Sequence, residues 1–223
     1  MKKIIFIIGI FWITTSFAND TIDRVHIKKI LKEKKISHLI YISKTSFKLF
    51  VVDKSLKILD ETKIAYGSNP DQKPKIYSGD HRTPEGLYKI IEILRNDMPT
   101  TSWQYKKLKK MNSVYFYAKY GHSKWNKPKE NLGKEAYGYG FFRLNYPNSQ
   151  DKKRYIRFFK KGLIPKKRNG QYPGFGGGIA IHGTNDPDSI GHLASTGCIR
   201  VLNSELKRIA PYLQYGTYVY IVH

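Results

Sequence analysis

The sequence has few cysteines and few acidic residues, and it lacks internal repeats and long apolar runs beyond its N-terminus. Its 223 residues include one cysteine, Cys198, so a disulfide within the chain is excluded. Acidic residues are few, because 17 Asp and Glu stand against 40 Lys and Arg, and the formal charge is +23 at pH 7. No internal repeat occurs, and no long apolar run follows residue 13. The length and the 14% aromatic content suit one globular domain with a packed core.

The first eighteen residues have the pattern of an export signal. Lys2 and Lys3 precede an apolar run, Ile4 to Ile13, and Ser16 and Ala18 are small residues at the positions that a signal peptidase inspects. The run is short for a membrane span. We therefore expect residues 1–18 to be a signal peptide, the protein to be periplasmic, and no stable membrane insertion after cleavage.

The basic residues are spread along the chain. No five or six of them are consecutive, so we expect attraction to anionic wall polymers or lipids rather than a dedicated nucleic-acid groove, and no nucleic-acid partner. Residues 95–135 interleave lysines with aromatic residues. We interpret this stretch as an insertion whose aromatic side chains pack on the domain edge. A surface that stacks on nucleic acid or sugars is the alternative.

Short apolar segments separated by turn residues predict a mainly β domain over residues 38–223. The expected strands are 39–42, 47–52, 56–66, 86–93, 141–146, 179–181 and 218–222. Helices are expected within the lead-in segment 19–37, at 155–161, and up to residue 210 after a cap at Asn203 or Ser204. Many strands and few short helices indicate a sandwich or barrel-like pair of sheets.

The residues around Cys198 predict a nucleophilic thiol. A lone cysteine in an exported protein suggests a reactive thiol or an intermolecular bridge, while a buried inert cysteine is the plain alternative. A thiol attacks as thiolate and needs a base. His182 ends a short apolar strand, and the loop 184–194 is long enough to fold back and bring the thiol to its imidazole. We expect Cys198 and His182 to share one crevice.

The neighbours of Cys198 fit acyl transfer. Gly197 allows a sharp turn, and the N–H groups of Gly197 and Cys198 are expected to face an oxyanion. Period-two alternation puts Arg200 on the same face as the thiol, where a guanidinium favours a thiolate or binds a substrate carboxylate. Ser195 is expected to hold the loop by hydrogen bonds. Zinc binding by His182, His192 and Cys198 with nearby aspartates matches no standard spacing, so no metal and no cofactor are expected.

These motifs resemble those of the L,D-transpeptidase catalytic domain, or YkuD family. The family signature is His-Gly and, after a loop, Ser-x-Gly-Cys-hydrophobic-Arg, which matches His182-Gly183 and Ser195 to Arg200; Asn203 matches a common asparagine. Gly79 to Tyr88 matches the Gly…Thr-Pro-x-Gly-x-Tyr segment. Leu144 to Asn148 with Asp151 is similar to the YafK-type branch. The resemblance covers roughly residues 38–222 and implies a β-rich fold with a catalytic cleft.

The resemblance also implies roles for individual residues. Cys198 is the nucleophile, His182 the base, and the backbone carbonyl of Gly183 orients the imidazole. Thr196 stands where the family most often has histidine, a change that it tolerates. The residues expected to contact substrate are Arg200, Ser195, Thr196, Gly197 and Tyr146.

Peptidoglycan stem peptides are the implied substrate. The thioester formed on Cys198 has three outcomes: an amine gives a crosslink, water gives L,D-carboxypeptidase trimming, and a lipoprotein lysine gives attachment, whose reverse releases a wall-linked lipoprotein. We predict an L,D-transpeptidase, with carboxypeptidase or lipoprotein-releasing hydrolase as alternatives. A non-catalytic basic module that binds wall polymer is the alternative from another class.

Overall fold

The computed structural model describes residues 22–223, so the predicted signal peptide lies outside the described residues. The helices are α1 Arg24–Lys34, α2 Trp103–Asn112, α3 Ser149–Lys160 and α4 Asn203–Ile209, with 3-10 turns η1 Ala118–Tyr120, η2 Pro187–Ser189 and η3 Ala210–Tyr212. The strands are β1 His38–Ser43, β2 Lys48–Asp53, β3 Ile58–Lys63, β4 Tyr66–Gly67, β5 Gly86–Arg95, β6 Ser123–Lys124, β7 Lys127–Asn131, β8 Gly140–Leu144, β9 Ala180–His182, β10 Leu193–Ser195, β11 Ile199–Arg200 and β12 Tyr218–Val222.

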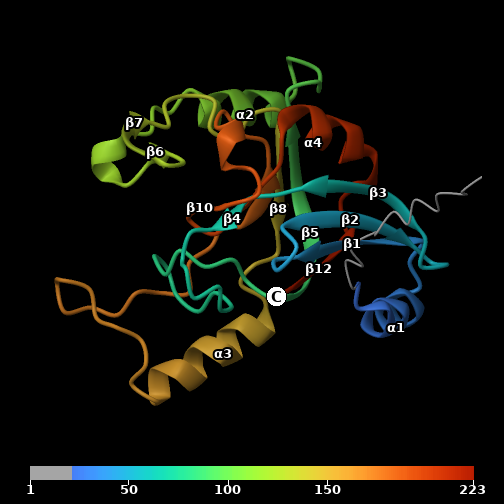
Figure 1. Ribbon diagram of the computed structural model, residues 1–223, viewed down its shortest axis with the longest axis horizontal. Helices are drawn as coiled ribbons and strands as arrows, with labels where there is room; N and C mark the ends of the chain where they lie inside the picture. Colours follow the sequence, from blue (N-terminus) through green and yellow to red (C-terminus); the bar gives the residue numbers. More distant parts are fainter. Residues whose placement is uncertain (1–21) are drawn as a thin grey trace, which may run out of the picture.

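The mainly β fold predicted from the sequence is confirmed. Eight strands form one curled sheet in the order β11-β9-β8-β5-β12-β1-β2-β3, and β10-β4 and β6-β7 form two small ladders (Figure 1). Most neighbours in the eight-stranded sheet are antiparallel, but β12 runs parallel to β1 and β11 runs parallel to β9. The last pairing concerns function, because it lays the segment after Cys198 beside the strand that ends at His182.

Alternating residues in the central strands supply two separate cores. In β1, Ile40 and Ile42 face the main core, which also contains Tyr66, Tyr88 and residues of α4. Leu39 and Tyr41 face the other side and pack with Ile27 and Leu31 of α1. Both faces of β1 are therefore buried, as its apolar sequence requires. No helix within residues 22–223 has the length and apolar composition to cross a membrane.

Local hydrogen bonds explain where the helices differ from expectation. Helix α3 begins six residues before the predicted start at residue 155, because Asn148 and Asp151 form a capping box. Asn203 is the first residue of α4 rather than its cap, and Leu202 precedes it without a side-chain cap. The Asn203 amide instead bonds the backbone of Tyr139 and Thr184. It thereby braces the loop after His182.

The stretch 95–135 folds into α2, η1 and the β6–β7 hairpin. Leu108 of α2 packs against Leu94, Phe141 and Ala180, as expected of an insertion on the domain edge. The aromatic residues divide into two groups. Phe116 turns inward, whereas Trp103, Tyr115, Tyr117 and Tyr120 are exposed. The expectation of packed aromatic side chains is therefore wrong for these four.

Candidate active site

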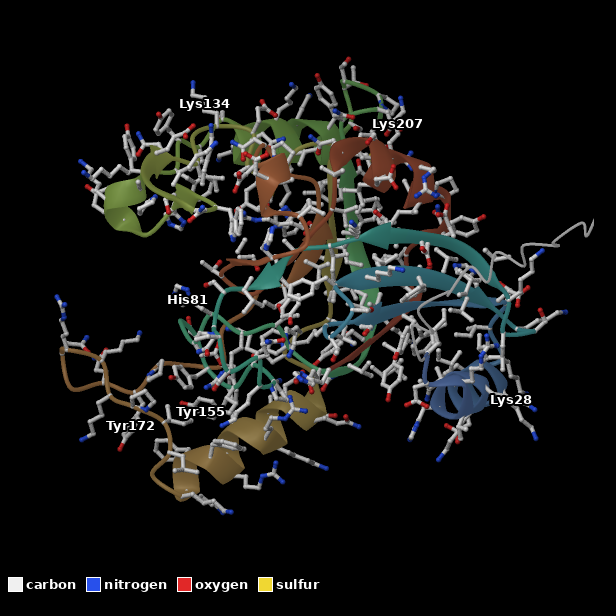
Figure 2. All side chains as sticks on the ribbon, in the orientation of Figure 1. Lys28, His81, Lys134, Tyr155, Tyr172 and Lys207 are labelled. Atoms are coloured by element: carbon white, nitrogen blue, oxygen red, sulfur yellow. The ribbon has the colours of Figure 1, made fainter. Side chains whose placement is uncertain are left out.

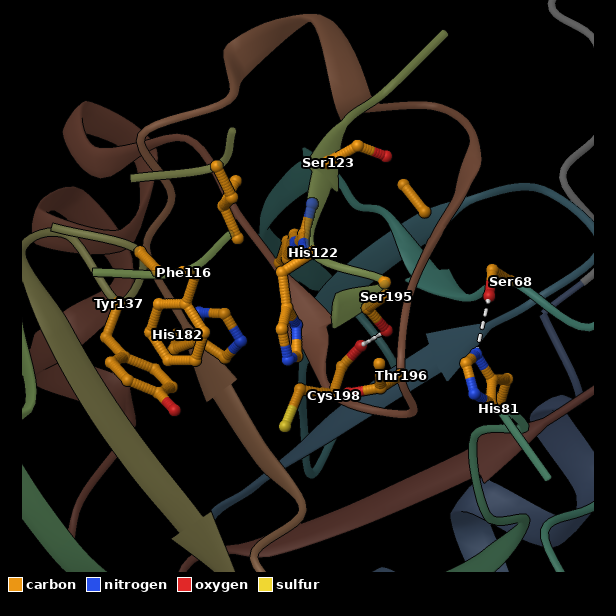
Figure 3. A pocket seen from close by; sticks show the side chains of 15 residues that line it. Ser68, His81, Phe116, His122, Ser123, Tyr137, His182, Ser195, Thr196 and Cys198 are labelled. Carbon is orange, nitrogen blue, oxygen red and sulfur yellow. Dashed lines mark hydrogen bonds between the residues drawn. The ribbon is translucent and has the colours of Figure 1, made fainter. Parts of the chain in front are cut away.

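The parallel pairing of β9 with β11 brings Cys198 and His182 to one pocket. Arg200 lies opposite His182 in the ladder, and Cys198 immediately precedes β11. The pocket holds about 180 Å³ and is lined by all three of these residues together with Phe116, His122 and Tyr137. Figure 3 shows the Cys198 sulfur and the His182 ring directed into this shared space. The expectation of a common crevice is met.

His182 is held as a neutral imidazole. Its Nδ1 lies 2.5 Å from the carbonyl oxygen of Gly183, and a carbonyl only accepts, so Nδ1 carries the proton and Nε2 keeps its lone pair. Tyr137 and Phe141 pack on the ring with centroids 5.2 and 6.0 Å away. Burial, and then the Arg200 charge, lower the pKa of His182 to about 3 despite the Gly183 bond. The unprotonated Nε2 is the form that a general base requires.

Cys198 is half-buried, and its thiol donates to the carbonyl of Gly178 at 3.5 Å. Burial raises the pKa of the Cys198 thiol. Three groups oppose this rise: the Ala180 N–H, the Arg200 guanidinium and the Lys75 ammonium. These shifts leave a neutral thiol and a neutral imidazole in the same pocket.

Arg200 is the buried charge of the pocket. Its side chain is 10% exposed, and Nη1 lies 3.6 Å from Oδ2 of Asp186, too far for a hydrogen bond. Nη1 is buried without a hydrogen-bond partner among the described residues. Burial lowers the pKa of Arg200, although Asp186 opposes this shift. An unpartnered donor on a pocket wall is suited to an acceptor on a bound molecule.

The loop carrying Cys198 is held by hydrogen bonds and by close packing. Ser195 Oγ donates to the Cys198 carbonyl at 2.5 Å and accepts from the Gly197 N–H at 3.0 Å. The Thr83 hydroxyl, buried, donates to the Gly197 carbonyl and accepts from the Gly67 N–H. Since the Gly197 N–H is used by Ser195, the expectation that it faces an oxyanion is wrong. The Cys198 N–H remains as the candidate donor.

A second pocket of about 500 Å³ meets the first at the thiol. Cys198, Thr196, His81 and Tyr137 line both pockets, and Lys75 lines the second. Lys75 is buried and its ammonium bonds Asp80 at 2.6 Å. The sequence patterns did not single out His81, His122, Tyr137 or Lys75 as site residues. The signal for His81 was its place inside the Gly79 to Tyr88 motif.

Tyr146 lies outside the lining of both pockets. Its side chain is 6% exposed and packs in the main core, where its hydroxyl donates to the Phe175 carbonyl at 3.0 Å. The expectation that Tyr146 contacts substrate is not supported by this position. It supports the segment that leads to Gly178 instead. Within residues 22–223, no group of three His, Cys, Asp or Glu side chains is placed to hold a metal ion.

The β6–β7 hairpin is fastened to the loop that follows His182. The backbone N–H of Trp125 donates to Asp186 Oδ2 at 2.9 Å, and the Trp125 ring stacks on His192 with centroids 3.7 Å apart. The Asn185 amide donates to the Leu132 carbonyl. Asp186 thus contacts the insertion on one side and Arg200 on the other, so the insertion is part of the pocket's construction.

Comparison with protein families matches residues 37–221 to YkuD, the L,D-transpeptidase catalytic domain. The chain belongs to this family. The match spans nearly all the described residues and includes Cys198, His182 and the Gly79 to Tyr88 motif. Enzymes of the L,D-transpeptidase family act on peptidoglycan peptides. A search among curated proteins found no match.

Solved structures with a similar arrangement include three bacterial proteins. Bd1075 of Bdellovibrio bacteriovorus is 22% identical with a TM-score of 0.47, over 83% of this chain and 48% of that one. Pgp2 of Campylobacter jejuni, a helical cell shape determining protein, is 24% identical with a TM-score of 0.46, over 83% and 47%. An L,D-transpeptidase from Mycobacterium smegmatis is 12% identical with a TM-score of 0.43, over 84% and 59%. The chain spans about half the length of the first two.

Proposed function

We propose that the protein is an exported, periplasmic L,D-transpeptidase that forms a thioester between Cys198 and a peptidoglycan stem peptide. The observation that carries this proposal is the shared pocket of Cys198, His182 and Arg200. A non-catalytic binding module has no need for a half-buried thiol that shares a pocket with a neutral imidazole of fixed tautomer. The family assignment agrees with the proposed substrate class.

The proposed reaction uses the Cys198 thiol and the His182 imidazole, which line one pocket. As the Cys198 sulfur attacks the carbonyl before a terminal D-alanine, its proton passes to Nε2 of His182. The carbonyl oxygen takes the negative charge, facing the Cys198 N–H. The tetrahedral intermediate then collapses: the peptide C–N bond breaks, His182 returns the proton to the leaving amine, and the thioester remains. Gly183 keeps the imidazole in one tautomer throughout, as its 2.5 Å contact with Nδ1 indicates.

The second pocket offers room beside the thiol for a second stem, which supports transfer as the proposed outcome. Two spaces of about 180 and 500 Å³ adjoin the same sulfur. The first can hold the acyl group while the second admits an amine, whereas a water acceptor needs no such room. Carboxypeptidase trimming and lipoprotein release share the thioester and are distinguished by product.

The test is incubation with purified muropeptides followed by mass spectrometry. We expect joined dimers from the wild type and none from Cys198→Ala, which should retain binding to peptidoglycan. Loss of D-alanine without dimers would instead assign trimming, and release of a peptide-linked lipoprotein would assign detachment. A carbapenem should add one equivalent to the wild type and none to Cys198→Ala. Unmodified protein and unchanged muropeptides together would refute a cysteine acyl-enzyme.

A further inference from the structure

Helix α3 and the loop after it form an arm that stands out from the sheet. Figure 1 shows α3 and this loop on one side of the molecule, away from α1 and α4. We call residues 152–178 the basic arm. Its return segment passes Phe175 and ends at Gly176 to Gly178, which line the second pocket beside Cys198. The arm therefore connects directly to the wall of the candidate active site.

Helix α3 and the returning loop pack against each other on the inner face of the arm, and Arg154 ties the helix to neighbouring segments. The Tyr155 hydroxyl donates to the Pro173 carbonyl at 2.7 Å, and its ring lies 4.5 Å from that of Phe175. Arg154 bonds the buried Asp151 and the Glu85 carbonyl. Figure 2 shows Tyr155 and Tyr172 between the helix and the returning loop. Phe159 stacks on Tyr155 with ring centroids 6.3 Å apart, so one side of its ring is packed and the other is exposed.

The outward face is cationic and lacks compensating charge. Residues 152–178 contain no aspartate or glutamate, and their cations are Lys152, Lys153, Arg154, Arg157, Lys160, Lys161, Lys166, Lys167 and Arg168. In the described part of the chain, only Arg154 of these forms an ion pair. By contrast, Lys107 and Lys124 of the similarly basic insertion are paired with Glu92 and Glu130. The arm presents a positive surface that its own fold does not neutralise.

Large apolar side chains lie exposed among these cations. Ile156 and Phe159 lie one turn apart on α3 and are 47% and 44% exposed. Leu163, just after the helix, is 58% exposed, and Tyr172 contacts Phe159 with ring centroids 4.8 Å apart. A soluble polyanion would pair with the cations and leave these apolar groups in water. A lipid surface takes both, because aliphatic and aromatic groups enter the acyl boundary while lysines reach the headgroups.

We propose that the basic arm binds the surface of an anionic phospholipid bilayer. The helix lies along the headgroup plane, with Ile156, Phe159 and Leu163 directed into the lipid and the lysines on the phosphates. This is peripheral binding and needs no spanning segment. Because the arm ends at Gly178, such binding holds the pocket at a fixed height above the membrane.

Vesicle co-sedimentation of the whole chain tests the proposal. The vesicles are phosphatidylglycerol mixed with phosphatidylcholine, or phosphatidylcholine alone. Lys160→Glu/Lys161→Glu changes the arm, and Lys109→Glu/Lys110→Glu makes the same change in the last turn of α2. Ile156→Ser/Phe159→Ser removes apolar groups, with Val25→Ser on α1, 79% exposed, as its control. Lys166→Glu/Lys167→Glu, in the loop, repeats the charge test should the helix variants misfold.

We expect binding to the anionic vesicles alone. Each lysine lost from the arm should weaken it about fivefold, and Ile156→Ser/Phe159→Ser about tenfold or more. The α2 and Val25 controls should bind within about twofold of wild type on the same scale. An equal loss of vesicle binding in Lys160→Glu/Lys161→Glu and Lys109→Glu/Lys110→Glu would show that the net charge of the protein, not the arm, causes the binding. If Ile156→Ser/Phe159→Ser still binds the anionic vesicles like the wild type, and soluble polyphosphate binds the protein with the same affinity as the vesicles do, the arm binds polyanions in general. The proposal of bilayer binding would then be refuted.

Discussion

Acidification should destabilise this protein through His182, and the size of the effect follows from its burial. The pKa of this imidazole is about 3 in the folded protein and 6.5 in the unfolded chain, because burial and the Arg200 charge disfavour imidazolium. Between these values the unfolded state binds the proton and the folded state does not. Stability is therefore retained above the unfolded pKa and lost as the pH falls below it. From neutral pH to about pH 5 the loss is about 2 kcal/mol.

The measurement is urea unfolding of wild type and His182→Gln at neutral pH and at about pH 5. Glutamine cannot titrate, so the wild type should lose about 2 kcal/mol more than the variant over this interval. His26→Gln, an exposed change on α1, should follow the wild type. Parallel losses in the wild type and His182→Gln would mean that the imidazole accepts its proton readily in the fold. The neutral-base reasoning would then be refuted.

Two further predictions concern the loop that carries the thiol. Gly197→Ala should abolish acyl-enzyme formation with a carbapenem, because the φ of Gly197 is +136° and an added Cβ would lie 2.8 Å from the Arg82 carbonyl oxygen. Gly191→Ala is the control: its φ is +90°, but no atom lies within 4 Å of the added Cβ, so acyl-enzyme formation should continue. Thr83→Val should lower the free energy of unfolding by about 1–3 kcal/mol, because the Gly67 N–H and Gly197 carbonyl lose their buried partner. Thr83→Ser, which keeps the hydroxyl, should cost less in the same urea titration.

The sequence predicted most of the sheet because its strands carry a local signal. The apolar run 39–42 lies within β1, and the run 47–52 overlaps β2, which begins one residue later at Lys48. The motif spacing located Cys198 and His182 in one pocket. The single long strand expected at 56–66 is instead β3 followed by the two-residue β4. No local pattern reveals this break, because β4 pairs with β10, more than a hundred residues away.

The rest of the site depends on contacts between distant segments. His122 lines the pocket from the insertion, which is fastened through Trp125 to Asp186 and His192. The use of the Gly197 N–H by Ser195 is a matter of side-chain geometry that spacing does not encode. Tyr146 sat in a matched motif yet faces the core. A motif thus locates a segment near a site but does not tell which of its side chains reach the reacting atoms.

Arg200 gives the proposed proton transfer its direction. Burial raises the pKa of Cys198 and lowers that of His182. The Arg200 charge opposes the first shift and adds to the second, so it favours the thiolate and disfavours the imidazolium. A stable thiolate–imidazolium pair would leave two like charges buried side by side, the imidazolium and the guanidinium. In the proposed mechanism, release of the proton from Nε2 to the leaving amine relieves that repulsion. Asp186, at 3.6 Å, opposes the lowering of the Arg200 pKa by burial and so stabilises the buried guanidinium that produces this effect.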